Sequence, residues 1–362
     1  MSHTDLSIVR ARIDKIDTEI QNLIMQRAEL AQEVAKAKRA EDPNPYFYRP
    51  ERETEVLNKA KQRNHGVLPD ASVVVIFREI MSACLALQKP LSIAFLGPEG
   101  TYSQAAVLKH FGHAINAVPL PTIESVFANI EAGNSDYGMV PVENSTEGGV
   151  NQTLQCLLKT PLRICGEVDL AIHHNLLAQT FELQNIQRVY SHQQSLGQCR
   201  SWLDSHLPHV ERIAVNSNAE AARRAVAEPD SAAIAGQIAA DTYHLSIVAP
   251  NIEDNPNNTT RFVVLGKQMV QATGKDKTSL VIGAVHSNQP GTLFHVLKPF
   301  ADHQINMTRI ESHPSRQGIW HYLFFIDIEG HEQNPAVSRA LDELAAHTSF
   351  IKRLGSYPCA IA

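Results

Sequence analysis

Apolar residues recur at alternating spacings of three and four along the first forty residues of the chain. Between Asp5 and Arg39 there is no proline or glycine. This period predicts one amphipathic helix with a narrow apolar stripe. The stripe comprises Leu6, Val9, Ile13, Ile16, Ile20 and Leu23, and it resumes at Leu30 and Val34.

A helix of this length has a consequence for assembly. At 1.5 Å per residue, about 35 residues span about 50 Å, which is longer than a small domain is wide. Two shorter helical segments follow, from Glu51 to about Asn64 and from Asp70 to Gln88. Three helices, one of them very long, bury their apolar stripes best against a second copy. The sequence therefore predicts a homodimer.

Cations interrupt the apolar stripe. Arg27 occupies a stripe position, and Lys38, eleven residues later, points in the same direction to within about 20°. A buried cation needs an anionic partner, which is either a carboxylate of a neighbouring helix or a bound anion. Two cations on one buried face favour an anionic ligand. Arg10 lies about 25 Å from Arg27 along the helix axis, so it reaches the same ligand only from an antiparallel partner chain.

After Lys89-Pro90 the pattern changes to short apolar strands that alternate with helices. The strands are expected at Leu91 to Leu96, Tyr137 to Val142, Val189-Tyr190 and Ala232 to Ala235. Each strand leads through a polar turn into a helix. This alternation predicts parallel α/β sheets, in which ligands bind beyond the carboxyl ends of the strands.

The turns at these strand ends are rich in Ser, Thr, Asn, Gln and Gly. They read GPEGTYSQ, ENSTEGGVNQ and SHQQSLGQ, and an asparagine-rich loop runs from Asp254 to Phe262. Helix N-termini at such turns present N–H groups and a positive dipole end to an anion. The same residue types also serve as ordinary helix caps, which is the simpler interpretation of any single turn. Three such turns together with Arg261 favour a dicarboxylate ligand.

The C-terminal segment, from Lys275 to Ala362, has the order β-α-β-β-α-β, which is typical of a ferredoxin-like α+β fold. No acid/base constellation is visible in it, which favours ligand binding over catalysis. The strands are expected at Ser279 to Val285, Ile305 to Glu311, Ile319 to Ile328 and Phe350 to Gly355, and the helices at Gly291 to His303 and Pro335 to His347.

The composition excludes several classes of function. A length of 362 residues with 43% hydrophobic and 19% charged residues suits two or three globular domains. A net charge of −6 without a basic stripe argues against nucleic acid as a partner. The chain lacks a secretory signal and an apolar run long enough for a membrane span. Five scattered cysteines without C-x-x-C indicate a cytoplasmic protein with reduced thiols, and the absence of H-E-x-x-H argues against a metal.

The helical segment resembles the all-helical chorismate mutase family, an intertwined dimer whose active sites draw on both chains. The positions that carry the resemblance, and which it implies to be catalytic, are Arg10, Arg27, Lys38, Arg52, Glu53 and Gln88. Guanidinium groups bind the two carboxylates of chorismate bidentately. Lys38 and Gln88 are the candidates for the ether oxygen, and Glu53 for the ring hydroxyl. The Claisen rearrangement needs positioning and charge stabilisation but no cofactor.

Residues 91–268 resemble prephenate dehydratase. The resemblance rests on the glycine-rich first turn and on three motifs in order: E-N-S-x-x-G-x-V (Glu143, Asn144, Ser145, Gly148, Val150), S-H-x-Q (Ser191, His192, Gln194) and T-R-F (Thr260, Arg261, Phe262). It implies two α/β lobes similar to periplasmic binding proteins, with the site in the cleft between them. It also implies the decarboxylating dehydration of prephenate to phenylpyruvate.

The resemblance to the dehydratase assigns a role to each of these residues. Thr260 is expected to donate a proton to the departing ring hydroxyl, and Arg261 to hold a carboxylate. Because a threonine hydroxyl is a modest acid, Glu143 and His192 stand as alternative donors. The other residues expected to line the cleft are Thr101, Ser103, Asn144, Ser145, Thr146, Gln194 and Phe262.

Residues 275–362 resemble an ACT domain. The phenylalanine-regulated members of that family carry G-A-L-V and E-S-R-P motifs, which here read Gly291-Thr292-Leu293-Phe294 and Glu311-Ser312-His313-Pro314. The resemblance implies phenylalanine as the effector, although a domain that serves only dimerisation is an alternative. The expected effector-binding residues are Pro290, Gly291, Thr292, Leu293, Asn306, Glu311 and Ser312.

As a whole, the chain resembles the bifunctional chorismate mutase/prephenate dehydratase family, with domains at 1–89, 91–268 and 275–362. The expected partners are chorismate, prephenate, phenylalanine and further copies of the chain, without a cofactor, a membrane or nucleic acid. A solute-binding protein with a helical dimerisation module is an alternative, but the lack of an export signal and the cations on the helix count against it. A second alternative is an enzyme whose mutase segment is vestigial.

Overall fold

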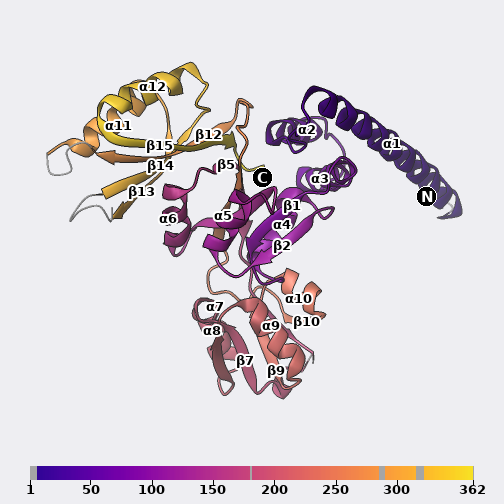
Figure 1. The fold of residues 1–362 in the computed structure, drawn as a ribbon. Coiled ribbons are helices and arrows are strands. Elements are labelled where there is room, and N and C mark those ends of the chain that lie inside the picture. The colour runs from indigo at the N-terminus through magenta and orange to yellow at the C-terminus, as the bar shows by residue number, and fades with distance from the viewer. Residues whose placement is uncertain (1–5, 180–181, 285–289, 315–321, 362) are drawn as a thin grey trace. The chain divides into compact units, whose positions relative to one another are not determined.

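A computed structural model describes residues 6–179, 182–284, 290–314 and 322–361 of the chain (Figure 1). The chain divides into two compact units. The first contains residues 1–49, 56–91 and 111–116, and the second contains residues 50–55, 92–110 and 117–362. Of the predicted elements, Asp5, Val285 and residues 319–321 lie outside the described residues.

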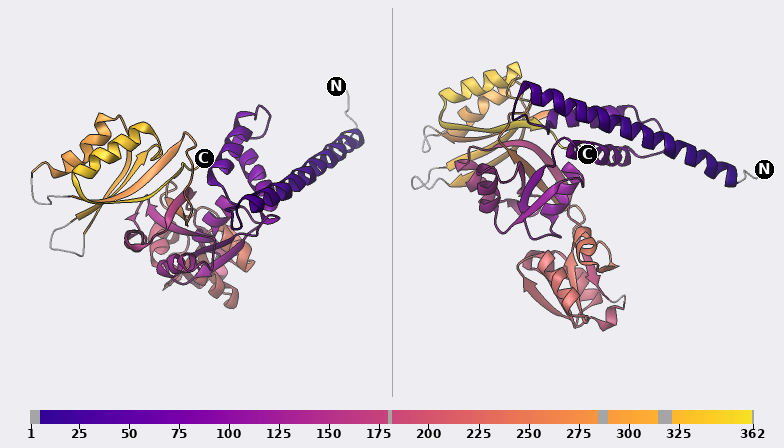
Figure 2. Two further views of the ribbon diagram at one scale, coloured as in Figure 1. Left: turned by 45° about the horizontal axis from the view of Figure 1, so that its top comes forward. Right: turned by 45° about the vertical axis from the view of Figure 1, so that its right-hand side comes forward.

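The first unit is built from helices, as the sequence predicts. Helix α1 (Leu6–Glu41) is a single helix of 36 residues that packs along α3 (Asp70–Ala86) (Figure 2). The stripe residues Ile13, Ile20 and Leu30 are each about half exposed or more. Ala35 is buried, so the C-terminal part of α1 has neighbours within the unit. Among the described residues, most of the stripe is therefore left exposed by the rest of the first unit.

Helix α2 (Pro50–Gln62) begins at a proline, which is suited to the first helical position because its missing N–H needs no partner there. Glu51 and Glu53 in the first turn and Lys59 and Lys61 in the last complement the helix dipole. Residues 50–55 belong to the second unit and the rest of α2 to the first.

The second unit begins with a sheet of order β2-β1-β3-β11-β5, with β4 paired to β3. Strands β1 and β3 are parallel, but β11 is antiparallel to both β3 and β5. The elements are β1 (Ser92–Leu96), α4 (Tyr102–Phe111), β2 (Asn116–Leu120), α5 (Ile123–Glu131), β3 (Tyr137–Asn144), β4 (Gly148–Gly149), α6 (Asn151–Lys159), β5 (Arg163–Ala171) and β11 (Thr259–Gly266).

A second sheet has the order β10-β6-β9-β7-β8. Strands β7, β8 and β9 are parallel, whereas β6 and β10 are antiparallel to their neighbours. The elements are β6 (Asn175–Ala178), η1 (Leu183–Asn185), β7 (Arg188–His192), α7 (Gln193–Gln198), α8 (Arg200–His206), β8 (Glu211–Val215), α9 (Asn218–Ala227), β9 (Ser231–Ala235), α10 (Gln237–Tyr243) and β10 (Ser246–Ala249).

The prediction of purely parallel sheets is therefore wrong. Both sheets are mixed because the chain crosses between them twice, from β5 to β6 and from β10 back to β11 (Figure 2, right). Strand β11 re-enters the first sheet between β3 and β5 and runs against both. This return places the end of the asparagine-rich loop beside the E-N-S motif at the end of β3.

The C-terminal domain has the predicted order of strands and helices. Its sheet, β13-β14-β12-β15, is antiparallel at every described pairing, and α11 and α12 cover one face (Figure 1). The elements are β12 (Asp276–Ala284), α11 (Thr292–Asp302), β13 (Met307–Pro314), β14 (Tyr322–Glu329), α12 (Pro335–Ala346) and β15 (Thr348–Pro358).

Alternation along the C-terminal strands divides their side chains between two cores. Leu280 and Ile282 pack with α11 and α12, whereas Val281, Phe325 and Leu354 join the core of the first sheet. Successive residues of a strand point to opposite faces, so β12 contributes to both. The C-terminal sheet and the first dehydratase-like sheet consequently share one apolar core.

Gly355 on β15 is a position where this shared core depends on a glycine. Its φ is +151°, and a Cβ atom there would lie 2.3 Å from the carbonyl oxygen of Ile164 on β5. We expect Gly355→Ala to lower the free energy of unfolding by about 2–3 kcal/mol, through backbone strain and the forced separation of β15 from β5. Thermal denaturation measures this loss.

Gly274→Ala is the matched control for that experiment. Gly274 also has a positive φ, of +92°, but a Cβ atom there would meet no atom within 4 Å. It therefore reports the cost of the backbone conformation alone. Equal losses of stability in the two variants would show that the close approach of Gly355 to Ile164 contributes nothing.

Candidate active sites and regulatory domain

Lys38 and Arg39 at the end of α1 are held by the loop that follows the helix. The Lys38 ammonium donates to the carbonyl oxygens of Tyr46 and Phe47, at 3.3 and 3.1 Å. The Arg39 guanidinium stacks on the Phe47 ring and donates to the Gln88 carbonyl at 2.7 Å. Residues 46–47 thus fix the direction of the Lys38 side chain, and Gln88, just beyond α3, helps to hold Arg39.

The other predicted mutase residues are placed as follows. Arg27 is half-buried and Arg10 is exposed on α1. Gln88 has a buried side-chain oxygen without a hydrogen-bond partner among the described residues, a costly state unless a ligand supplies one. Arg52 and Glu53 lie in the first turn of α2, where Arg52 pairs with Glu55 at 2.5 Å. The structure describes that turn as part of the second unit, separately from Arg27 and Lys38.

The register between β3 and β11 arranges the dehydratase motifs. Thr260 lies opposite Asn144, and Arg261 lies opposite Glu143. Residues that face each other across an antiparallel pair point to the same side of the sheet, and the next pair points to the other side. Asn144 and Thr260 therefore share one face, and Glu143 and Arg261 share the opposite face.

On the first of these faces, hydrogen bonds join four polar side chains that we call the amide cluster: Asn144, Thr146, Asn258 and Thr260. The Asn144 amide donates to the Thr260 hydroxyl oxygen at 2.8 Å and to the Asn258 side-chain oxygen at 2.9 Å. The Thr146 hydroxyl donates to the same Asn258 oxygen at 3.4 Å. Because the Thr260 oxygen accepts from Asn144, its own proton is directed elsewhere and can serve as a donor.

The amide cluster connects to the second sheet through residues that the sequence analysis did not select. The Asn258 amide donates to the Gln198 side-chain oxygen at 3.4 Å, and Gln198 lies 2.8 Å from His174 Nε2. His174 Nδ1 is in turn 2.8 Å from the Tyr102 hydroxyl. His174 is 1% exposed, and this burial lowers its pKa, so the imidazole is neutral at pH 7. The first and third polar turns thus converge on the amide cluster.

Most of the other polar-turn residues lie at helix starts, and Ser145 lies on the turn between β3 and β4. Thr101 donates to the Leu96 carbonyl at 3.2 Å, and Ser103 is buried in the first turn of α4. His192 precedes α7, and its ring accepts from the Gln194 N–H at 3.4 Å. Ser145 on the exposed turn after β3 accepts from the Thr259 N–H at 3.0 Å. Only the contact of His192 caps a helix, whereas Thr101 and Ser145 tie their turns to β1 and β11.

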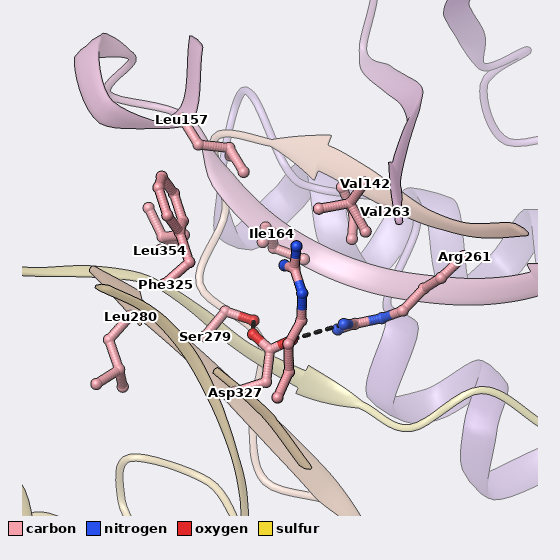
Figure 3. A pocket seen from close by; sticks show the side chains of 11 residues that line it. Val142, Leu157, Ile164, Arg261, Val263, Ser279, Leu280, Phe325, Asp327 and Leu354 are labelled. Atoms are coloured by element: carbon pink, nitrogen blue, oxygen red, sulfur yellow. Dashed lines mark hydrogen bonds and ion pairs between the residues drawn. The ribbon is translucent and has the colours of Figure 1, made fainter. Parts of the chain in front are cut away.

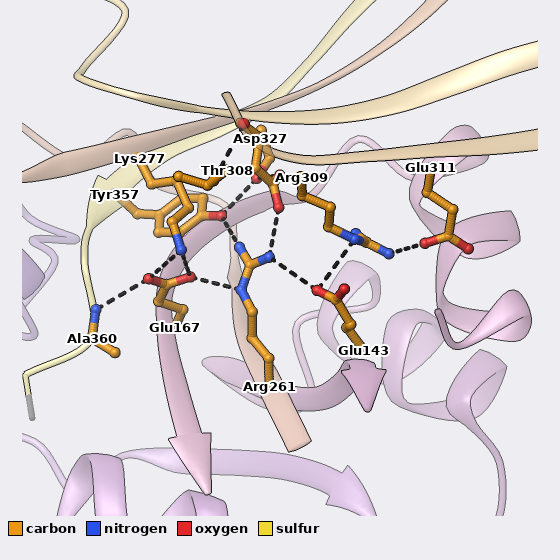
Figure 4. A network of polar contacts seen from close by, with 11 residues as sticks. Glu143, Glu167, Arg261, Lys277, Thr308, Arg309, Glu311, Asp327, Tyr357 and Ala360 are labelled. Carbon is orange, nitrogen blue, oxygen red and sulfur yellow. Dashed lines mark hydrogen bonds and ion pairs between the residues drawn. The ribbon is translucent and has the colours of Figure 1, made fainter. Parts of the chain in front are cut away.

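Arg261 and Glu143 have a different environment from the one expected of cleft residues. The Arg261 guanidinium donates to Glu167 at 2.8 Å, to Asp327 at 2.5 Å and to the Tyr357 hydroxyl at 2.8 Å (Figure 4). Glu143 lies 3.3 Å from Arg309 of β13. Strand alternation explains the difference, because it turns both side chains away from Thr260 and toward the C-terminal domain. Phe262, also expected in the cleft, is 2% exposed.

The Arg261 network comprises these groups and two further donors: Glu143, Glu167, Arg261, Lys277, Ser279, Arg309, Asp327 and Tyr357 (Figure 4). Burial opposes the charge on Arg261, but Tyr357, Asp327 and Glu167 outweigh it and raise the pKa of the guanidinium. Burial likewise opposes the charge on Asp327, yet Arg261 and the Ser279 hydroxyl hold the pKa of this carboxyl below its ordinary value. Both groups are therefore ionised in the folded protein.

A small pocket lies beside this network, between the first sheet and the C-terminal sheet (Figure 3). Ile164 and Val263 line it from one sheet, and Leu280 and Leu354 line it from the other. Its polar lining consists of Arg261, Asp327, Ser279 and Arg309. The pocket is thus a feature of the domain interface rather than an opening at Thr260.

The predicted effector residues occupy two places in the C-terminal domain. Pro290 and Gly291 precede α11, Gly291 has a φ of +83°, and Thr292 and Leu293 form the first turn. Glu311 and Ser312 lie on β13, where Glu311 pairs with Arg309. Asn306 is exposed just before β13, and its carbonyl accepts from the Glu329 N–H at 2.9 Å.

The described residues contain neither a metal-binding cluster nor a helix suited to a membrane. No group of three or more His, Cys, Asp and Glu side chains in the described part of the chain is placed to hold a metal ion. Within the same residues, every helix is too short or too polar to cross a membrane.

Comparison with known families defines the class of protein. The family model of chorismate mutase type II matches residues 9–89, that of prephenate dehydratase matches residues 93–270, and that of the ACT domain matches residues 279–346. The chain is thus a multidomain enzyme in which two catalytic domains precede a regulatory ACT domain.

Curated relatives specify the family. The chain is 51% identical over 366 residues to the bifunctional chorismate mutase/prephenate dehydratase of Stutzerimonas stutzeri, with 100% of each chain covered. It is 51% identical to the protein of that name in Pseudomonas aeruginosa, with 98% of each chain covered. A crystal structure of prephenate dehydratase from Arthrobacter aurescens in complex with L-Phe has a TM-score of 0.68, 35% identity, and coverage of 74% of this chain and 90% of that one. The chain belongs to the bifunctional chorismate mutase/prephenate dehydratase family.

Proposed function

We propose that the chain converts chorismate to prephenate in residues 1–89 and prephenate to phenylpyruvate in residues 91–268, under feedback inhibition by phenylalanine through residues 275–362. The observation that carries the dehydratase assignment is the hydrogen bond of 2.8 Å from the Asn144 amide to the Thr260 hydroxyl oxygen. This bond links a residue of the E-N-S motif to a residue of the T-R-F motif on the same face of the sheet.

In the dehydratase reaction the ring hydroxyl and carbon dioxide leave together as the ring becomes aromatic. Thr260 donates its proton to the departing hydroxyl, since its oxygen already accepts from Asn144. The threonine is a weak acid, so the proton moves as hydroxide character develops on the leaving oxygen. His192 is an alternative donor. The helix starts at Thr101, Ser103 and Gln194 and the turn at Ser145 and Thr146 bind the substrate's carboxylates.

In the mutase reaction each active site takes residues from both chains of a homodimer. The uncovered stripe of α1 supports this proposal, because such a long apolar surface is stabilised by a second copy. Arg27 binds the carboxylates together with Arg10 of the partner subunit. Lys38 and Gln88 stabilise the charge on the ether oxygen. Arg52 and Glu53 complete the site at the start of α2.

A coupled assay tests both steps and their regulation. Supplied with chorismate alone, the purified chain should accumulate phenylpyruvate, which absorbs under alkali, and added phenylalanine should lower the rate of prephenate dehydration. The differential affinity of phenylalanine for two arrangements of the enzyme gives the physical reason for inhibition. If chorismate is converted only as far as prephenate, the chain has mutase activity without dehydratase activity. If the chain turns over added prephenate but not chorismate, it has dehydratase activity without mutase activity. A flat response to phenylalanine would contradict the regulatory role.

A further inference from the structure

Arg261 connects the dehydratase sheet to the ACT domain directly behind Thr260. The two residues are neighbours on β11 and point to opposite faces of the sheet. The Arg261 side chain is 12% exposed, and its partner Glu167 belongs to the same sheet. It also lies 3.8 Å from Glu143 of the same sheet. Its partners Asp327 and Tyr357 belong to β14 and β15 of the ACT domain.

Asp327 is also held by a hydrogen bond within the ACT domain, independently of its contact with Arg261. The Ser279 hydroxyl donates to one carboxylate oxygen of Asp327 at 2.5 Å, and Arg261 donates to the other at 2.5 Å. Ser279 and the Tyr357 hydroxyl are 2.6 Å apart. The Asp327 side chain is 6% exposed. A buried carboxylate held on both oxygens is a rigid support for the guanidinium that it binds.

Thr260 lies in the interior of the first sheet, opposite Asn144 of β3 and Leu170 of β5. Residues 254–257 of the preceding loop are exposed, and the pairing of β11 with β3 is irregular between Arg261 and Phe262. The side-chain contacts of Arg261 add a restraint on the backbone at Thr260 that comes from the ACT domain.

A second ion pair lies beside the first. Arg309 of the ACT domain contacts Glu143, the neighbour of Asn144 on β3, and also pairs with Glu311 of the effector motif. Glu311 lies so close to Gly149 of the E-N-S-x-x-G-x-V segment that a Cβ atom there would be 2.2 Å from its carboxylate. Charged residues of the ACT domain thus contact the neighbour of Asn144 on β3 and the neighbour of Thr260 on β11.

We propose that Asp327 of the ACT domain is a positioning residue for the dehydratase reaction, acting through Arg261 to hold Thr260 in place. This inference rests on the proposed role of Thr260 as proton donor. It assigns Arg261 to the support of the strand, whereas the motif alone suggests that Arg261 binds the substrate. A catalytic hydroxyl displaced by about 1 Å reduces turnover by up to about 10²-fold, so the support has a measurable effect.

Asp327→Asn in the full-length chain tests this proposal. Asparagine keeps the size of the side chain but removes the charge that binds Arg261. The expected result is a fall of about tenfold or more in kcat for prephenate, with KM near the parental value. The chorismate mutase rate of the same sample should not change. Asp342→Asn, the same substitution at an exposed position of α12, is the matched control and should leave both rates unchanged.

Tyr357→Phe keeps the proposal testable if Asp327→Asn does not fold. It removes one hydrogen bond to Arg261 and leaves the buried ring in place. A smaller fall in kcat, again without a change in KM, is expected. Thermal denaturation of each variant shows whether the loss of turnover occurs in folded protein.

A double-variant cycle separates support from substrate binding. If Arg261 acts by holding the strand, Arg261→Lys lowers kcat, and adding Asp327→Asn lowers it little further, because the two residues act as one unit. If Arg261 binds the substrate, Arg261→Lys raises KM and the effects of the two changes multiply. The second result, or an unchanged kcat in Asp327→Asn, would overturn the proposal. Retained turnover in Thr260→Ala would instead refute the proposed role of Thr260.

Discussion

Replacing Thr260 by alanine is expected to abolish the dehydration of prephenate and to leave the rearrangement of chorismate at the parental rate. The alanine side chain has no proton to donate and no oxygen to accept the hydrogen bond from Asn144. Proton donation by a positioned side chain contributes typically about 10²–10⁴-fold to a rate, and we expect the loss to lie in this range. Separate assays with prephenate and with chorismate measure the two activities in one preparation.

Thr260→Ser is the matched control, since serine keeps the hydroxyl and loses only a methyl group. It should retain much of the dehydratase rate, although a freer rotamer will cost part of it. If alanine and serine variants turn over prephenate at similar, near-parental rates, Thr260 is not the proton donor. That outcome would point to His192 instead.

Much of the architecture follows from patterns that are local in the sequence. The three-and-four spacing from Leu6 to Val34, in which Arg27 replaces one apolar residue, predicts α1 almost to its ends, because the segment contains no proline or glycine. The C-terminal domain was also predictable, since each of its strands and helices has its own period and a turn on either side. In both cases neighbouring residues carry the information.

The mixed character of the two sheets was not predictable in this way. The position of β11 between β3 and β5 depends on a return from the second sheet after more than eighty residues, counted from the end of β5 at Ala171 to Thr259. Alternation of strand and helix indicates parallel neighbours only when the chain stays in one sheet. A strand that comes back from another sheet can enter in either direction.

The environments of Arg261 and His174 show what motif reasoning leaves out. The T-R-F motif groups Thr260 with Arg261, but adjacent residues of a strand face opposite sides, and only the contacts show that Arg261 meets Asp327. His174 lies outside all three motifs. Its contacts with Tyr102 and Gln198 join segments far apart in the sequence, and no spacing reveals them.

One strand pair therefore serves two purposes. The Asn144 and Thr260 side chains form part of the amide cluster, while Glu143 and Arg261 carry the contacts to the ACT domain. We therefore expect a displacement of the ACT sheet to move the backbone that bears both. This shared backbone would connect the proposed effector motif to the proposed dehydratase residues.

Replacing Arg27 by leucine is expected to lower the chorismate mutase rate by about 10²-fold or more while the dimer persists. The loss of a charge-assisted hydrogen bond to a carboxylate costs about 3 kcal/mol, which corresponds to a factor of that size. Leucine completes the apolar stripe on α1, so the proposed interface between two copies gains apolar area. Mutase kinetics and analytical ultracentrifugation measure the two effects, and the prephenate dehydratase rate serves as the internal control.

The choice of leucine separates the two interpretations of Arg27. If Arg27 paired with a carboxylate of a neighbouring helix, its loss would leave that carboxylate buried without a partner, a change that typically costs about 3–5 kcal/mol. The dimer would then weaken and the protein would melt at a lower temperature. If Arg27 binds chorismate, the leucine variant keeps or raises its melting temperature, and the mutase rate alone falls. Lower stability accompanied by normal mutase turnover would therefore exclude the substrate-binding role of Arg27.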